Sequence, residues 1–189
     1  MTPGPTRDPF GPTPRWSFAV ALLPLALLLI AMAGAYPFLP DPLPVHWDGA
    51  GEADRLVEKS PIPLLAYAAT AAGPVAVVLG IGLLNPAKIR INGVRDPQGL
   101  AEADSERYLV MKGRFIRHVA HGIAFWVGLL VAAAPIGLLL GAGTWWVLAC
   151  MVLIVPVLVI AFRATGRMNT WIREEFDPSA HGARGTASR

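Results

Sequence analysis

The segment 39–60, LPDPLPVHWDGAGEADRLVEKS, brings together the residue types of this chain that can do chemistry. It contains one histidine, His46, beside one tryptophan, Trp47. Its acidic residues are Asp41, Asp48, Glu52, Asp54 and Glu58. Imidazole and carboxylate groups together can bind a metal ion, transfer protons or recognise a charged ligand. These three kinds of site are therefore the hypotheses to compare.

A metal site and a hydrolytic site both lack the residues they need. The spacing of His46, Asp48 and Glu52 matches no common ligand pattern, and one histidine with oxygen ligands binds metals weakly and unselectively. The nearest hydroxyl, Ser60, lies at the edge of the next apolar run, and the sequence has no G-x-S-x-G, P-loop, dinucleotide-binding, zincin or haem-attachment motif. Acid–base catalysis by the carboxylates alone stays open, with no motif in its favour. We predict a non-enzymatic protein without catalytic residues, metal or cofactor.

The segment is predicted to have a defined shape. Pro40, Pro42 and Pro44 stand at every second position and favour an extended, polyproline-like course. The DGAGE sequence that follows predicts a turn in which Gly49 and Gly51 can adopt positive φ. A shaped loop with exposed polar groups is suited to binding.

Outside this segment, His118 and His121 are three residues apart and fall on one helical face. They allow a paired metal site or proton relay, or the commoner arrangement in which histidines hydrogen-bond to headgroups or helix ends. The only cysteine, Cys150, excludes an intrachain disulfide and a cysteine-based zinc site.

The composition indicates a membrane protein. Of the 189 residues, 54% are hydrophobic and 15% are charged. This composition gives more apolar surface than a soluble protein of this size can bury. Four apolar runs without acidic residues, lysine or arginine reach about the 20 residues that a helix needs to cross a bilayer; they are 16–36, 62–84, 119–140 and 145–162. We therefore predict an all-α membrane protein with four transmembrane helices. Glycines within the runs, including Gly73, Gly80 and Gly128, are expected to allow close helix packing.

The basic residues predict the orientation. Only Arg55 and Lys59 lie between the first and second runs, while the other lysines and arginines flank the runs on the opposite side. The positive-inside rule then places both termini in the cytoplasm and the loop 37–61 outside. Small residues at 31–35 also resemble a signal-peptide cleavage site, but the preceding apolar run is longer than usual for one. Basic residues around apolar runs argue against nucleic-acid binding.

The chain divides into five parts. Residues 1–15 are predicted to be a disordered cytoplasmic N-terminus, 16–84 the first helix pair, 85–118 a basic cytoplasmic loop and helix, 119–163 the second helix pair, and 164–189 a cytoplasmic tail. Asp96 and Pro97 are predicted as N-cap and first residue of an amphipathic helix that continues into the third run.

The first loop resembles a short motif of the bacterial membrane family called domain of unknown function 1648. The matching positions are Pro44, His46, Trp47, Gly51, Glu52, Asp54 and Lys59. The chain departs from the motif at Asp48, where asparagine is common, and in lacking a glycine shortly before Lys59. Some larger members are similar to SdpI-type immunity proteins, which protect bacteria from a secreted antimicrobial peptide.

The resemblance implies a sensing or immunity-like role at the inner (cytoplasmic) membrane. The expected ligand-binding residues are Pro44, His46, Trp47, Glu52, Asp54 and Lys59, with the inner helix at 97–118 responding. The expected partners are the lipid bilayer and an extracellular peptide or membrane protein, and no nucleic acid. A small transporter or an accessory subunit of a membrane complex is the alternative, and an enzyme at the outer surface is a third hypothesis.

Overall fold

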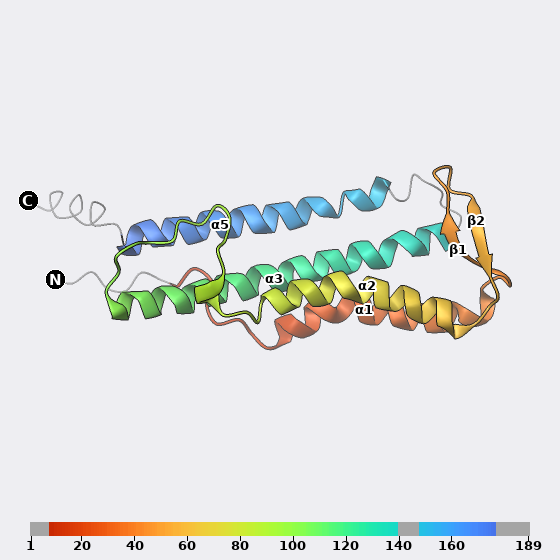
Figure 1. The fold of residues 1–189 in the computed structure, drawn as a ribbon, viewed down its shortest axis with the longest axis horizontal. Helices are drawn as coiled ribbons and strands as arrows, with labels where there is room; N and C mark the ends of the chain where they lie inside the picture. Colours follow the sequence, from red (N-terminus) through yellow and green to blue (C-terminus); the bar gives the residue numbers. More distant parts are fainter. Residues whose placement is uncertain (1–7, 140–147, 177–189) are drawn as a thin grey trace, which may run out of the picture.

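The computed structural model describes residues 8–139 and 148–176, without the side chains of Trp47 and of residues 134–139. Four long helices run roughly side by side: α1 (Trp16–Ala35), α2 (Pro61–Ile81), α3 (Glu102–Leu139) and α5 (Ile154–Phe176) (Figure 1). Two short 3-10 helices, η1 (Tyr36–Phe38) and η2 (Pro86–Lys88), follow α1 and α2. A hairpin of β1 (Leu43–Trp47) and β2 (Ala53–Val57) joins α1 to α2.

The described parts of the four predicted spans are mostly helical; a turn at residues 152 and 153 interrupts the fourth, whose residues 145–147 lie outside the described part. Each belongs to a helical segment long and apolar enough to cross a membrane. Their outward sides keep large apolar side chains accessible, such as Ile30 of α1, 68% exposed, and Ile62 of α2, 74% exposed. In water such exposure is costly, whereas hydrocarbon solvates these side chains well. The prediction of a mostly helical chain with four helices long and apolar enough to cross a membrane is confirmed.

Helix α3 is the centre of the bundle, with α1 and α2 packed against it and α5 packed against it separately. Small residues bring α3 close to its neighbours: Ala124 is fully buried against Ala21 and Val75. A Cβ on Gly128 of α3 would lie 3.3 Å from the Cβ of Pro24 in α1. Close packing through Gly128 is therefore confirmed. The same expectation is wrong for Gly73 and Gly80, where an added Cβ would meet no atom within 4 Å.

The hairpin corrects the all-α prediction. Strands β1 and β2 pair antiparallel, with Pro44 opposite Leu56. Two extended segments joined by a short turn satisfy each other's backbone groups, which a lone polyproline-like segment cannot do. Proline fits in β1 because both strands of a two-stranded hairpin are edge strands. The predicted turn is present, with Gly51 at φ +87°, although Gly49 does not have a positive φ.

Helix α3 begins later than predicted. Its first residue is Glu102, not Pro97, and Gly99 adopts φ +68° in the connection before it. The carboxylate of Asp96 accepts hydrogen bonds from Tyr108 and Lys112 of α3 and so does not cap a helix. From Glu102 the helix continues without a break into the third apolar run, as the sequence predicted.

The segment 8–15 also differs from its prediction as part of a disordered terminus. Asp8 pairs with Arg114 of α3, and the ring of Phe10 lies edge-on to Phe115 with centroids 5.4 Å apart. Residues 1–7, and the tail from residue 177, lie outside the described residues. The part of the N-terminal segment that is described therefore belongs to the packed structure around α3.

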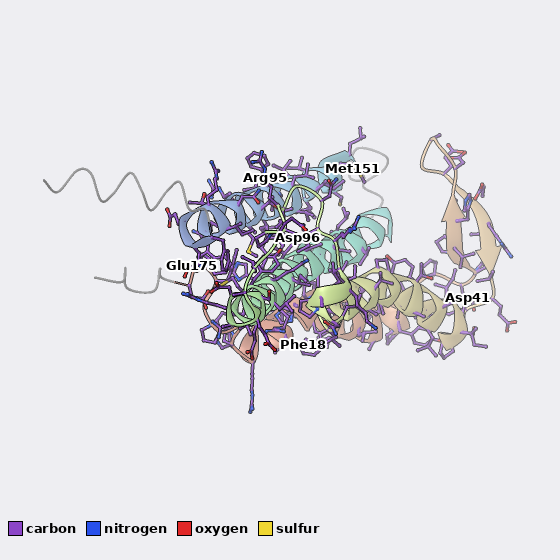
Figure 2. The ribbon with its side chains drawn as sticks, turned by 60° about the vertical axis from the view of Figure 1, so that its left-hand side comes forward. Phe18, Asp41, Arg95, Asp96, Met151 and Glu175 are labelled. Carbon is purple, nitrogen blue, oxygen red and sulfur yellow. The ribbon has the colours of Figure 1, made fainter. Side chains whose placement is uncertain are left out.

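The hairpin and the connection between α2 and α3 lie at opposite ends of the bundle (Figure 1). The start of α1 and the end of α5 share the end that carries this connection. Asp41 lies beside the hairpin, whereas Phe18, Arg95, Asp96 and Glu175 lie away from it (Figure 2). This arrangement separates the polar hairpin from most of the basic residues by the length of the apolar helices.

Candidate functional site in the hairpin

Two helix ends carry the hairpin. Helix α1 continues into η1, after which Leu39 turns the chain into an extended course. On the return, Ser60 is extended and α2 begins at Pro61. Proline is favoured at a first helical position because it has no N–H to lose and its φ is already helical. The sequence thus starts α2 immediately after the hairpin and leaves little free chain at its base.

Lys59 ties the two sides of this base together. Its Nζ donates hydrogen bonds to the carbonyl oxygens of Pro37, at 3.2 Å, and Leu39, at 2.8 Å. The ammonium also lies 5.4 Å from the centroid of the Tyr36 ring, and the Lys59 backbone N–H donates to Asp41 Oδ1 at 3.2 Å. The carbonyls at a helix C-terminus carry partial negative charge, which favours a cation there. The structure therefore gives Lys59 a positioning role, while its role as a ligand contact stays a prediction.

Asp48 holds the turn at the other end of the hairpin. Its Oδ1 accepts hydrogen bonds from the backbone N–H groups of Ala50 and Glu52, each at 2.9 Å. The Asp48 backbone also donates to the Glu52 carbonyl at 2.9 Å. An asparagine side chain offers the same oxygen acceptor. An asparagine at this position could therefore accept the same two hydrogen bonds that Asp48 accepts here.

His46 and Asp54 form a pair across the two strands. His46 Nδ1 lies 2.5 Å from Asp54 Oδ1, although His46 is opposite Arg55 in the register. The pairing is irregular on both sides of His46, and this irregularity moves its side chain towards Asp54. The two side chains are 65% and 46% exposed, so solvent and ligands reach both. The hairpin thus brings two of the predicted binding residues into direct contact.

The other predicted binding residues of the hairpin differ in how exposed they are. Glu52 is exposed at the end of the turn, and Pro44 is half-buried in β1. Trp47 is the last residue of β1, and its side chain lies outside the described part of the structure. No group of three or more histidine, cysteine or acidic residues among those described is arranged to hold a metal ion. The exposed polar groups can bind a ligand through hydrogen bonds and charge.

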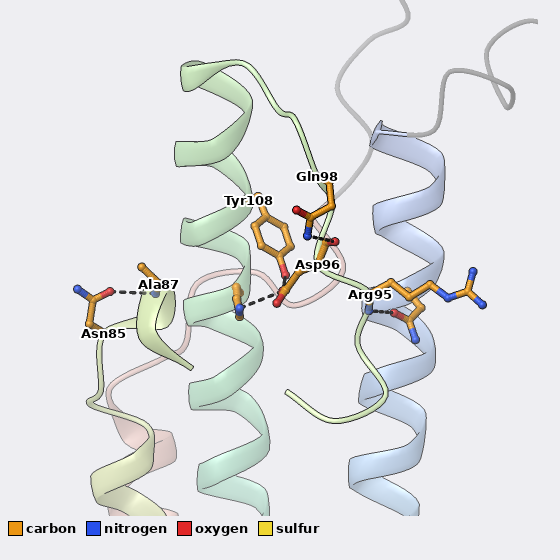
Figure 3. A network of polar contacts seen from close by, with 8 residues as sticks. Asn85, Ala87, Arg95, Asp96, Gln98 and Tyr108 are labelled. Carbon is orange, nitrogen blue, oxygen red and sulfur yellow. Dashed lines mark hydrogen bonds and ion pairs between the residues drawn. The ribbon is translucent and has the colours of Figure 1, made fainter. Parts of the chain in front are cut away.

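A second polar cluster, at the opposite end of the bundle, was not predicted. The Tyr108 hydroxyl and Lys112 Nζ both donate to Asp96, the latter at 3.0 Å, and Figure 3 shows Tyr108 directed at Asp96. Burial by itself raises the pKa of Asp96, but these hydrogen bonds and the positive charges of Lys112 and Arg90 outweigh it, so the pKa is lowered. This cluster fastens the connection before α3 to the helix itself. An aspartate before a proline is typical of a helix N-cap, and the sequence carries no signal that Asp96 is instead a partner of Tyr108 and Lys112.

His118 and His121 contact separate partners. His121 Nδ1 lies 2.7 Å from the Ser17 hydroxyl in the first turn of α1, whereas His118 faces the ring of Phe10 at 5.8 Å. The contact of His121 with the start of α1 agrees with the predicted arrangement in which these histidines hydrogen-bond to helix ends.

The comparison with known families concerns the N-terminal part of the chain, which contains the hairpin. Residues 14–70 match the family model described as domain of unknown function (DUF1648). The resemblance predicted from the loop motif is confirmed. The DUF1648 match covers α1, the hairpin and the first part of α2, so the hairpin is an internal part of the family domain. No match was found among curated proteins or among solved structures.

Proposed function

We propose that this protein is a multi-pass protein of the cytoplasmic membrane whose hairpin binds a ligand outside the cell, in a sensing or immunity-like role. The observation that carries the proposal is the exposed His46–Asp54 pair on a hairpin that is held at both ends. The sensing and immunity-like element rests on the resemblance to larger SdpI-type proteins and is a hypothesis about role.

Preorganisation favours binding by this loop. The Asp48 turn orders one end of the hairpin, and the Lys59 hydrogen bonds order the other. Ordering a flexible loop on binding costs free energy, and a loop already ordered avoids much of that cost.

The charge of the hairpin favours a cationic ligand. Between residues 39 and 60, acidic side chains outnumber the basic side chains of Arg55 and Lys59. Lys59 is already engaged with backbone carbonyls, and Asp48 is engaged within the turn. Glu52 and Glu58 stay exposed. A peptide carrying lysine or arginine residues is therefore the ligand class we expect.

Complementation tests this proposal. In a deletion strain with a measurable phenotype, such as sensitivity to a secreted antimicrobial peptide, the double variant His46→Ala with Asp54→Ala should fail to complement. Arg55→Ala, at an exposed position next to Asp54 on β2, is the matched control and should complement. Both proteins must reach the membrane at wild-type levels. Full complementation by the double variant would refute binding through this pair.

The proposal includes an orientation with both termini in the cytoplasm. The asymmetry of basic residues between the two ends of the bundle supports it. In a Cys150→Ala background, a thiol reagent that cannot cross membranes should label Ala50→Cys in intact cells and leave Arg95→Cys unlabelled. Both positions are exposed, at opposite ends of the bundle. The reverse labelling pattern would refute the orientation.

The alternative is an accessory subunit or small transporter. Among the described helices, α5 packs mainly on α3, which leaves much of its apolar surface open to lipid or to another membrane protein. A transport role has less support, because α1 and α2 contain no charged residue that could bind a solute at mid-membrane. Purified protein that carries no partner and moves no solute into liposomes would exclude this alternative.

A further inference from the structure

A groove runs along the middle of α5, beside the connection between α2 and α3. Its lining includes Asn92 and Gly93 from the connection between α2 and α3, and Leu158, Phe162, Arg163 and Asn169 from α5. We infer that this groove binds one anionic phospholipid, with its acyl chain along the apolar part and its phosphate at Arg163. The inference is independent of the hairpin and goes beyond the function proposed for it.

The groove has a fixed wall. Asn169 Nδ2 donates to the Gly93 carbonyl at 2.7 Å, and Asn169 Oδ1 accepts from the Arg95 backbone N–H at 3.1 Å. Gly93 adopts φ +81°, and a Cβ there would lie 3.4 Å from the side chain of Thr165. The connection is thereby held against α5, so the groove is a structured feature of the surface.

The polarity of the groove changes along α5. Leu158 and Phe162 are 62% and 82% exposed, so one part of the groove is open and apolar. The next residue, Arg163, begins the polar part, which continues to Asn169. A change from apolar to cationic and amide side chains within two turns marks the boundary between hydrocarbon and headgroups. A phospholipid has the same order of groups, with its acyl chain next to its phosphate.

The charge at this boundary favours an anion. No acidic residue is among those that line the groove, and no hydrogen bond or ion pair within the described residues involves the Arg163 side chain. Arg107 and Arg114 differ, since Arg107 pairs with Glu175 and Arg114 with Asp8. A guanidinium group can donate two parallel hydrogen bonds to a phosphate. Arg163 is thus available for a headgroup.

The floor of the groove offers a second way to test occupancy. Gly166 is exposed, and a Cβ added to it would meet no atom within 4 Å. A larger side chain at this position extends into the groove without a clash with the fold. Because Gly166 lies in the polar part of the groove, Gly166→Leu should obstruct the headgroup next to Arg163 while it leaves the charge unchanged.

The test is native mass spectrometry of the full-length protein in detergent, titrated with phosphatidylglycerol or with phosphatidylcholine of the same chains. One basic residue near anionic lipid contributes about 1 kcal/mol, so the wild-type protein should bind one phosphatidylglycerol about fivefold more tightly. Arg163→Gln should remove this preference. Arg173→Gln, the same charge change at an exposed position of α5 outside the groove, should keep it.

Gly166→Leu should weaken the binding of both lipids. Equal affinity of the wild-type protein for the two lipids would overturn the inference, as would equal losses in Arg163→Gln and Arg173→Gln. Displacement of phosphatidylglycerol by a similar concentration of inorganic phosphate would also overturn it, because the site would then recognise phosphate without the lipid. Each result leaves the hairpin proposal unaffected.

Discussion

Asp96→Ala should destabilise the protein, because it leaves the buried ammonium of Lys112 without its counter-ion. The Lys112 side chain is 4% exposed, whereas the Asp96 side chain is 37% exposed. Removal of one partner from a fully buried ion pair costs about 3–5 kcal/mol. Water reaches Asp96 here, so we expect a smaller loss, about 2–3 kcal/mol, to which the lost acceptor of Tyr108 contributes.

The reciprocal change should cost less. Lys112→Met removes the buried charge and fills its space with an apolar side chain, while Asp96 keeps Tyr108 and solvent as partners. We expect a loss of about 1 kcal/mol or less, since an apolar residue often replaces a buried charge without penalty. Glu106→Ala, an exposed acidic position on the same helix, is the control and should stay within about 0.5 kcal/mol of wild type.

Two measurements check this reasoning. Unfolding of the purified protein by denaturant in mixed micelles, followed by circular dichroism, gives the difference in free energy of unfolding. Trypsin cleavage at Arg90 and Arg95 reports local release of the connection that Asp96 fastens, and should be faster in Asp96→Ala. A larger loss in Lys112→Met than in Asp96→Ala, or wild-type stability of Asp96→Ala, would refute the role of Asp96 as counter-ion to a buried charge.

Three further predictions concern packing, the hairpin base and pH. Gly128→Ala should destabilise the bundle by about 1 kcal/mol, because the added methyl group crowds α3 against α1. Gly73→Ala, where the methyl group meets open space, should be neutral or stabilising. Thermal unfolding in detergent measures both effects. Lys59→Met should loosen the hairpin base by about 1–2 kcal/mol and speed trypsin cleavage at Arg55, while unchanged cleavage would contradict the positioning role. The pKa of Asp96 is lowered from 3.8, so its contribution to stability is complete well above pH 3.8 and is lost as the pH falls below that value. Asp96→Asn should therefore reduce the acid sensitivity measured by unfolding at different pH values.

The helices that are long and apolar enough to cross a bilayer could be predicted from the sequence because they depend on local properties. A run of about 20 apolar residues is helical in hydrocarbon whatever its neighbours are, since its backbone must satisfy itself. The turn at Gly51 is local in the same sense, because positive φ favours glycine. The residues of the loop motif also follow one another closely in the chain, so the match over residues 14–70 could be anticipated.

Contacts between distant residues needed the tertiary structure. The pairing of β1 with β2, the Lys59 hydrogen bonds to the end of α1 and the groove beside Arg163 each join segments whose approach no local pattern specifies. Asp96 shows the reason most clearly. Its sequence context suits a helix cap, but a buried lysine needs a counter-ion, and only the fold brings Lys112 within 3.0 Å. The sequence by itself thus determined the spans and the turn, and the packing of the helices decided which polar groups became partners.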